Sequence, residues 1–181
     1  MKPINLNPMN PPLNWQDKLP DELPQGWNER AAALCQAQSL TAALRALGGS
    51  FTVKVLYMGE LDGQGNSFGE NHAETAAPQF VRDVLLHLDG VPVVQARSAC
   101  SPQSQAWRGV LDCGTQPLGE RLFDGTLPLK RSAFEFCLME TAGGQDDFRR
   151  PVAARRSYFN WDGEVLELTE YFLPGLASIV R

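Results

Sequence analysis

The sequence predicts an α+β fold: a single antiparallel β-sheet of about six strands, with the helices packed on one side and a closed internal ligand pocket. Over residues 80–88 and 166–172 every second side chain belongs to a largely apolar row, and each stretch lies next to a short turn, which is typical of β-hairpins. About three helices fall between the five or six strands, and this order favours helices segregated to one side of the sheet. Each hairpin also carries one charged residue in an apolar row, which indicates a polar pocket.

The first part of the chain differs in composition from the rest. Residues 1–28 contain six of the thirteen prolines and little periodic structure, which predicts a proline-rich arm that lies over the domain or is partly disordered. Trp15 and Trp27 are expected to attach this arm. Residues 29–181 are expected to form one domain, because that length is enough to bury a substantial core.

Two short helices are predicted at the start of this domain. Asn28 and Ser39 are suitable N-caps for helices over residues 29–38 and 40–47, because each side chain can accept a bond from a free amide of the first turn. Gly48-Gly49 ends the second helix, since glycine readily adopts the left-handed conformation found after helices.

Alternating side chains then predict three strands. The first covers residues 51–58, and the next two, over 80–88 and 91–100, form a hairpin around Asp89-Gly90, a strong two-residue turn signal. Residues 59–78 between them are rich in Gly, Asn, Glu and Ala. They are expected to form a long loop, which is either a lid or a plain insertion.

The second half of the chain contains one helix and one further hairpin. A Ser-Pro pair opens the helix predicted over residues 101–112. Phenylalanine and leucine alternate along a strand over 132–139, and strands over 152–160 and 165–173 flank the turn Trp161-Asp162-Gly163-Glu164. The residues after Pro174 are expected to form a short tail.

Composition excludes several classes of function. The net charge of −5 argues against a nucleic-acid partner. No apolar run approaches the roughly 20 residues that a membrane span needs, and the N-terminus lacks the order of a signal peptide. The cysteines are not spaced as a metal site, so we expect reduced thiols, no metal and a cytoplasmic protein. The cysteines are expected to be buried structural residues. A cysteine nucleophile that works with His87 is the alternative, but no activating neighbour is visible in the sequence. These cysteines are Cys35, Cys100, Cys113 and Cys137.

Two opposite charges stand out in apolar rows. Arg82 interrupts the row of Phe80, Val84 and Leu86, and Glu170 interrupts that of Leu166, Leu168 and Phe172. A buried charge without a partner costs several kcal/mol, so each of them needs a partner or a ligand. One interpretation is a polar pocket between the strands. The alternative is a structural ion pair, or a strand face that is solvated at that end.

The segment Thr115 to Phe123 offers a second anchor for an anion. Pro117 at a first helical position would leave the amides of Leu118, Gly119 and Glu120 unpaired, and such amides attract anions. Water or a side-chain cap would also satisfy them.

Four motifs in this order resemble the chorismate pyruvate-lyase family, and their spacing fits from residue 39 to residue 174. They are Val81-Arg82-Asp83-Val84-Leu85-Leu86 with Asp89-Gly90 and Ala96-Arg97, Thr115-Gln-Pro-Leu-Gly-Glu-Arg-Leu-Phe123, Arg155-Arg156-Ser157, and Leu168-Thr169-Glu170-Tyr-Phe-Leu-Pro174. The resemblance implies a six-stranded antiparallel sheet with a closed pocket. It also implies elimination of pyruvate from chorismate to give 4-hydroxybenzoate, the entry step of ubiquinone synthesis, without any cofactor.

The resemblance also assigns site residues. Arg82 and the backbone amide of Leu118 match the groups that hold the ring carboxylate, and Glu170 matches the carboxylate that bonds the 4-hydroxyl, either as a base or only to orient the substrate. Leu40 stands where the family pattern has Met. The second carboxylate of chorismate needs its own cation, for which Arg97 and one of Arg155 or Arg156, with Arg156 preferred, are the candidates.

Three hypotheses remain at this point. The first is the lyase, acting as a monomer on chorismate, with marked inhibition by 4-hydroxybenzoate and lid opening that limits turnover. The second is a non-catalytic domain of the same fold that senses a small aromatic or carboxylic acid, although residues 1–50 contain no DNA-binding unit. The third is a small interaction domain in which Arg82 and Glu170 pair with each other.

Overall fold

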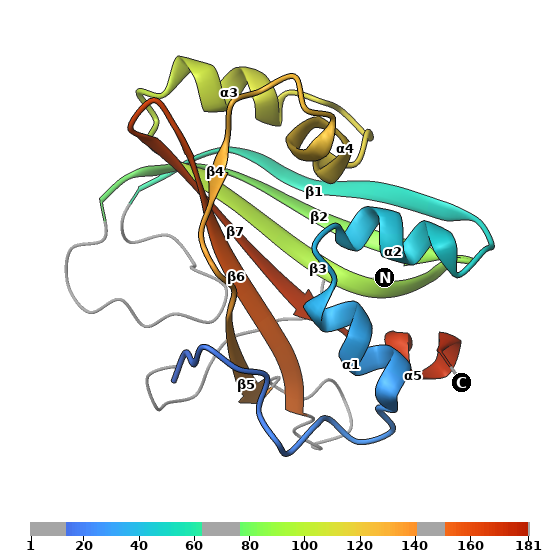
Figure 1. Cartoon of the computed structure of the whole chain (residues 1–181). Coiled ribbons are helices and arrows are strands. Elements are labelled where there is room, and N and C mark those ends of the chain that lie inside the picture. Colours follow the sequence, from blue (N-terminus) through green and yellow to red (C-terminus); the bar gives the residue numbers. More distant parts are fainter. Residues whose placement is uncertain (1–13, 63–76, 141–150, 181) are drawn as a thin grey trace.

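The structure is a computed structural model, and it describes residues 14–62, 77–140 and 151–180 (Figure 1). Its sheet has seven strands in the order β1-β2-β3-β7-β6-β4, with β5 also paired to β6, and every pairing is antiparallel. The strands are β1 (Phe51–Leu61), β2 (Gln79–Leu88), β3 (Val91–Cys100), β4 (Lys130–Arg131), β5 (Glu135–Glu140), β6 (Pro151–Trp161) and β7 (Glu164–Phe172). The predicted fold class is confirmed.

Both predicted hairpins are present and turn on an Asp-Gly pair. Asp89 and Gly90 have φ angles of 50° and 77°, and Asp162 and Gly163 have φ angles of 50° and 90°. Positive φ at both turn positions matches the right-handed twist of the strands, and glycine adopts it without steric cost. The second turn is two residues long, shorter than predicted, because the strands β6 and β7 continue to Trp161 and from Glu164.

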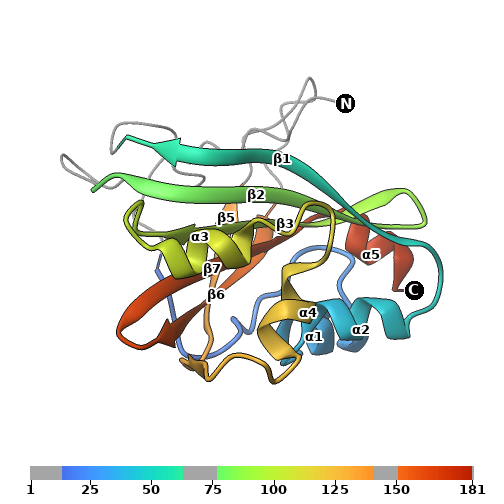
Figure 2. The same cartoon turned by 90° about the horizontal axis from the view of Figure 1, so that it is seen from above.

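The helices lie on one side of the sheet, as the view from above makes clear (Figure 2). They are α1 (Glu29–Gln36), α2 (Leu40–Ala46), α3 (Gln105–Leu111), α4 (Leu118–Phe123) and α5 (Gly175–Ile179). Asn28 and Ser39 cap α1 and α2 as predicted, by accepting bonds from the amides of Ala31 and Ala42.

Three helical predictions were wrong in detail. The cap of α3 is Ser104, whose Oγ accepts from the amide of Trp107, so Ser101 and Pro102 precede the helix. Pro117 is the N-cap of α4 and not its first residue. The segment after Pro174 forms α5, which the sequence analysis treated as a tail because five residues are too few for a helical pattern.

The helices and the sheet face beneath them enclose the main core. Trp107, Phe159, Phe172 and Leu44 are among its fully buried side chains. All of the cysteines are free and buried, as predicted. Burial raises the pKa of the Cys35 thiol to about 12, which keeps it protonated and unreactive.

The end of the N-terminal arm contacts the domain through both tryptophans. Trp27 meets the ring of Phe172 edge-on at 5.9 Å between centroids, and the guanidinium of Arg156 lies 4.3 Å from the ring centroid of Trp15. Gln16 exchanges two backbone hydrogen bonds with Phe136 in β5. Residues 1–13, and most of the predicted loop over 59–78, lie outside the described residues.

Two glycines give opposite predictions for stability. A Cβ on Gly175 would overlap the backbone carbonyl of Pro92, because α5 packs directly on the start of β3, whereas a Cβ on Gly109 in α3 would meet nothing within 4 Å. We expect Gly175→Ala to lower the free energy of unfolding by about 1–3 kcal/mol. Gly109→Ala should raise it by about 0.5–1 kcal/mol, because it restricts the unfolded chain. Urea unfolding of both variants checks this, and equal effects would contradict the tight packing of α5.

Candidate functional site

Two rows of side chains run across the sheet beneath the helices. Strand pairing aligns Arg82, Ser98, Leu168 and Ser157 in the first row, from β2 through β3 and β7 to β6. The second row aligns Val84, Ala96, Glu170 and Arg155 on the same strands. Because side chains two positions apart on a strand share one face, the two rows form one continuous floor.

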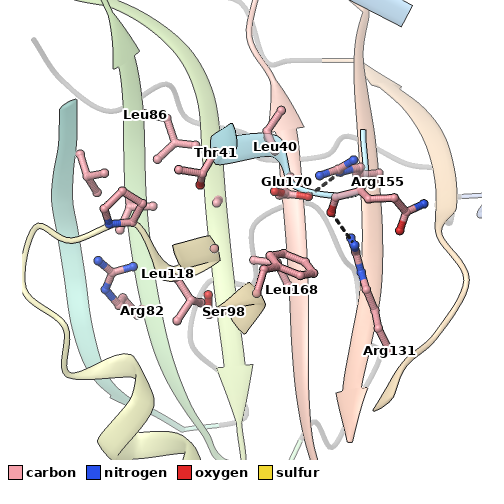
Figure 3. Close-up of a pocket in the computed structure, with 17 residues that line it drawn as sticks. Leu40, Thr41, Arg82, Leu86, Ser98, Leu118, Arg131, Arg155, Leu168 and Glu170 are labelled. Atoms are coloured by element: carbon pink, nitrogen blue, oxygen red, sulfur yellow. Dashed lines mark hydrogen bonds and ion pairs between the residues drawn. The ribbon is translucent and has the colours of Figure 1, made fainter. Parts of the chain in front are cut away.

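A cavity lies between this floor and the first turns of two helices (Figure 3). The start of α2 contributes Leu40 and Thr41, and the start of α4 contributes Leu118 and Gly119. The cavity is small: the space within it that a water-sized molecule can reach is about 40 Å³. Ligand pockets for small organic molecules measure roughly 300–1,000 Å³, so such a ligand requires the starts of α2 and α4 to move away from the floor.

Arg82 lies at one end of the first row, and its charged guanidinium is buried. Its side chain is 2% exposed, and its Nη2 donates to the carbonyls of Gly114 at 2.7 Å and Gln116 at 3.3 Å. Its Nε has no hydrogen-bond partner, and no carboxylate in the described residues forms an ion pair with Arg82. Burial lowers the pKa of Arg82, so an anion in the cavity would relieve an unfavourable environment.

Glu170 is held by Arg155 and not by Arg82. The Arg155 Nε donates to the Glu170 Oε2 at 2.5 Å, and the two side chains are 1% and 8% exposed. The Arg155 Nη1 also donates to the carbonyls of Cys35 at 2.9 Å and Ala37 at 2.6 Å, where the chain passes from α1 to α2. Arg155 therefore fixes the Glu170 carboxylate within the floor through one of its two oxygens.

Arg131, from the two-residue strand β4, brings a third guanidinium to the cavity (Figure 3). Its Nε donates to the Ser157 Oγ at 3.2 Å, and its Nη1 donates to the carbonyl of Gln38 at 2.6 Å. Burial and the neighbouring charge of Arg155 lower the pKa of Arg131 to about 10, so it remains charged at neutral pH.

The charges that line the cavity do not cancel. Arg82, Arg131 and Arg155 contribute three positive charges and Glu170 one negative charge, so the lining carries 3 − 1 = +2. The whole chain has a formal charge of −5, so this positive lining is a local feature. A cavity of this kind favours a small ligand with two negative charges.

The backbone at the start of α4 adds a neutral donor. No residue caps this helix with a side chain, and the amides of Leu118 and Gly119 have no hydrogen-bond acceptor in the described residues. The Glu120 amide is bonded to the Pro117 carbonyl, so it does not belong to the set that the sequence analysis proposed. Leu118 and Leu40 both line the cavity, at 8% and 4% exposure.

Two predicted site residues lie on the opposite face of the sheet, and their assignment to the site is corrected. Arg97 pairs with Asp83 through bonds of 2.8 and 2.6 Å, and Arg156 pairs with Glu135 at 2.6 Å. Neither arginine lines the cavity. The reason is the alternation of a strand: Ala96 and Ser98 face the cavity, so Arg97 between them faces away, and Arg155 faces Glu170, so Arg156 faces away.

Residues that sequence reasoning missed complete the site. They include Arg131, Gln38, Thr41 and Ser98. The starts of α2 and α4 cover the cavity, and most of the 59–78 loop, for which a lid was one expectation, lies outside the described residues. Thr41 and Gly119 join these two helices closely, because a Cβ on Gly119 would lie 2.8 Å from the Thr41 Oγ1.

The buried pair of Arg155 and Glu170 gives a prediction for stability. Arg155→Met leaves the carboxylate buried without its cation, and we expect it to lower the free energy of unfolding by about 3–5 kcal/mol. The double variant Arg155→Met with Glu170→Met removes both charges and should recover most of that loss.

Chemical denaturation of the two variants and of the unchanged protein measures this effect. A loss in the double variant as large as that in Arg155→Met would mean that the pair is not the source of the instability.

Comparison with known proteins identifies the family of the chain. The family model for chorismate lyase matches residues 15–180. A probable chorismate pyruvate-lyase from Ralstonia nicotianae is 34% identical over 179 residues and covers 90% of each chain. Another from Shewanella amazonensis is 34% identical over 176 residues, covering 91% of this chain and 86% of the relative.

Solved structures show a likeness in fold alone. PhnF from Mycobacterium smegmatis superposes with a TM-score of 0.50 and 17% identity, covering 76% of this chain and 64% of that chain. None of the helices in the described part of this chain is long and apolar enough to cross a membrane. On the family model and the identity to these relatives, the chain belongs to the chorismate lyase family.

Proposed function

We propose that this protein is a chorismate pyruvate-lyase, which eliminates pyruvate from chorismate and releases 4-hydroxybenzoate. The observation that carries the proposal is the match of charge between the cavity and the substrate. Chorismate has two carboxylates on a small ring system, and the cavity lining carries a charge of +2.

The ring carboxylate is proposed to bind between Arg82 and the amide of Leu118. Arg82 already uses Nη2 on two backbone carbonyls, and its buried Nε has no protein partner. A guanidinium is planar and suits a planar carboxylate, and the amide at the start of α4 adds a neutral donor. The bonds to Gly114 and Gln116 fix Arg82, so it needs little reorganisation when the substrate binds.

The ring hydroxyl is proposed to donate to Glu170. Arg155 holds one oxygen of this carboxylate at 2.5 Å, which leaves the other oxygen as an acceptor. Arg155 contacts the substrate only through Glu170 in this account, so it is a positioning residue. Leu40, Leu118 and Leu168 supply apolar surface for the ring.

The reaction that follows is an elimination that balances without an oxidant or a reductant. The ether C–O bond breaks, and its electron pair goes to the oxygen of the departing enolpyruvate. The ring carbon that bears the hydroxyl loses its hydrogen as a proton, and the C–H electron pair completes the aromatic ring. That proton goes to Glu170 or directly to the methylene carbon of the departing group, which becomes the methyl group of pyruvate. The step is redox-neutral, so we propose no cofactor.

Three further properties belong to this proposal. The protein is proposed to act as a monomer. The protein is proposed to act in the cytoplasm, with residues 29–181 as its catalytic domain and residues 1–28 as an arm. Its product is proposed to enter ubiquinone synthesis.

The direct test is turnover by the purified protein. We expect chorismate to yield 4-hydroxybenzoate, followed by its absorbance, and an equal amount of pyruvate, followed with lactate dehydrogenase. Arg82→Ala and Glu170→Gln should each lower kcat/KM by roughly a hundredfold, because each removes hydrogen bonds to a charged group.

Matched controls lie outside the cavity. Arg108→Ala on α3 and Glu167→Gln on β7 make the same kinds of change and should leave kcat/KM within about threefold. Binding of chorismate without turnover would instead favour the non-catalytic sensing domain. Unchanged rates in both Arg82→Ala and Glu170→Gln would remove the assignment of the site.

The enclosed cavity also predicts that the product leaves slowly. The starts of α2 and α4 cover the ring, so these helices must separate before 4-hydroxybenzoate can escape. We expect a burst of about one product per enzyme in rapid-mixing experiments, followed by a slower steady state. Added 4-hydroxybenzoate at millimolar concentration should inhibit the steady state. A linear time course with no inhibition would contradict this prediction.

A further inference from the structure

We propose that Arg131 binds the carboxylate of the enolpyruvyl group and stabilises the negative charge that forms on this group as the ether bond breaks. The inference rests on the proposed function and deepens it, because it assigns the second carboxylate of the substrate. The sequence left that carboxylate to Arg97 and to Arg155 or Arg156, and of these three only Arg155 lines the cavity.

The position of Arg131 matches the far end of an elongated dianion. Strand pairing places Arg82, Ser98, Leu168 and Ser157 in one row, and Arg131 donates to Ser157 at the end of that row. The two arginines therefore stand at opposite ends of the floor, with Leu118, Ser98 and Leu168 between them (Figure 3). A ligand with one carboxylate at Arg82 directs its other end toward Arg131.

The guanidinium of Arg131 has capacity for a ligand. Its Nε and Nη1 donate to Ser157 and Gln38, while its Nη2 has no acceptor among the described residues. No carboxylate of the described residues forms an ion pair with it. Burial and Arg155 both disfavour its charge and lower its pKa to about 10, and a bound carboxylate would offset both effects.

Aromatic rings hold this guanidinium in place before any ligand arrives. The Arg131 Cζ lies 4.0 Å from the ring centroid of Phe134, 5.2 Å from that of Phe159 and 5.3 Å from that of Phe123. Cation–π contacts of this kind favour a planar guanidinium and exclude water from its faces. A cation that is fixed and partly dry stabilises developing negative charge better than one that must first reorganise.

Arg155 is a weaker candidate for the same task, because its hydrogen bonds are already made. It holds Glu170 and two backbone carbonyls, and its charge is neutralised by Glu170 at 2.5 Å. Arg131 is the neighbouring cation that lacks such a partner. The departing enolpyruvate takes the electron pair of the broken C–O bond on its oxygen, next to the carboxylate held by Arg131.

The product supplies a probe that separates this role from a general effect on the cavity. 4-Hydroxybenzoate keeps the ring carboxylate and lacks the enolpyruvyl carboxylate. Arg131→Gln should therefore raise KM for chorismate and lower kcat, reducing kcat/KM by roughly ten- to a hundredfold. The affinity for 4-hydroxybenzoate, measured by calorimetric titration, should stay within about threefold. Arg82→Gln should weaken the binding of both molecules.

Two further variants complete the design. Arg131→Lys keeps the charge and loses the planar fork, so its kcat/KM should fall between those of Arg131→Gln and the unchanged protein. Lys130→Gln, at the neighbouring exposed residue of β4, removes the same charge outside the cavity and should have no effect. Binding of 4-hydroxybenzoate by Arg131→Gln also shows that the variant is folded.

The inference is overturned if Arg131→Gln keeps kcat/KM for chorismate within threefold of the unchanged protein. It is also overturned if this variant loses affinity for chorismate and 4-hydroxybenzoate equally, since Arg131 would then serve the cavity as a whole. An unchanged protein that produces no 4-hydroxybenzoate would instead contradict the proposed function, so the two failures are distinguishable.

Discussion

Three guanidinium groups, two of them buried and that of Arg131 partly buried, line the cavity with a single carboxylate, and most features of the site follow from that imbalance. Arg155 is neutralised by Glu170, whereas Arg82 and Arg131 have no carboxylate partner in the described part of the chain. Burying an unpaired cation costs several kcal/mol, and backbone carbonyls around both arginines compensate only part of that cost. In our proposal, an anion that binds beside these two arginines recovers the remaining cost, which favours a ligand with two negative charges.

The sheet separates this imbalance from a face where charges are matched. Asp83, Arg97, Thr169, Arg156 and Glu135 align in one row on the opposite face, by the same strand pairing that builds the floor of the cavity. In that row each arginine has a carboxylate, Arg97 with Asp83 and Arg156 with Glu135. Adjacent positions on one strand therefore serve different purposes: one face is stabilised by ion pairs, and the other retains positive charge for a ligand.

The sequence was sufficient to predict the fold class and the two charges in apolar rows. In β2 and β7 every second side chain falls in a largely apolar row, and Arg82 and Glu170 stand in those rows. The Asp-Gly turns marked both hairpins. The choice among Arg97, Arg155 and Arg156 depends on which face of each strand meets the helices. The face that meets the helices depends on how neighbouring strands pair, and the alternation within a single strand carries no information about that pairing.

Arg131 was beyond the reach of such patterns for a different reason. It belongs to a strand of two residues, which is too short for any periodicity, and it reaches the cavity through contacts with residues far away in the chain. The carbonyl of Gln38 is 93 residues away from it in sequence. The short helices α4 and α5 were missed or misplaced on similar grounds, because packing on the sheet and not their own sequence determines where they begin.

The orientation of the product in the cavity tests the central claim most directly. A crystal structure with 4-hydroxybenzoate bound should place its carboxylate against Arg82 and the amide of Leu118, and its hydroxyl against Glu170. The guanidinium of Arg131 should then face an open space where the second carboxylate of the substrate would lie. A product molecule bound in the reverse direction, with its carboxylate on Arg131, or bound outside this cavity, would contradict the account.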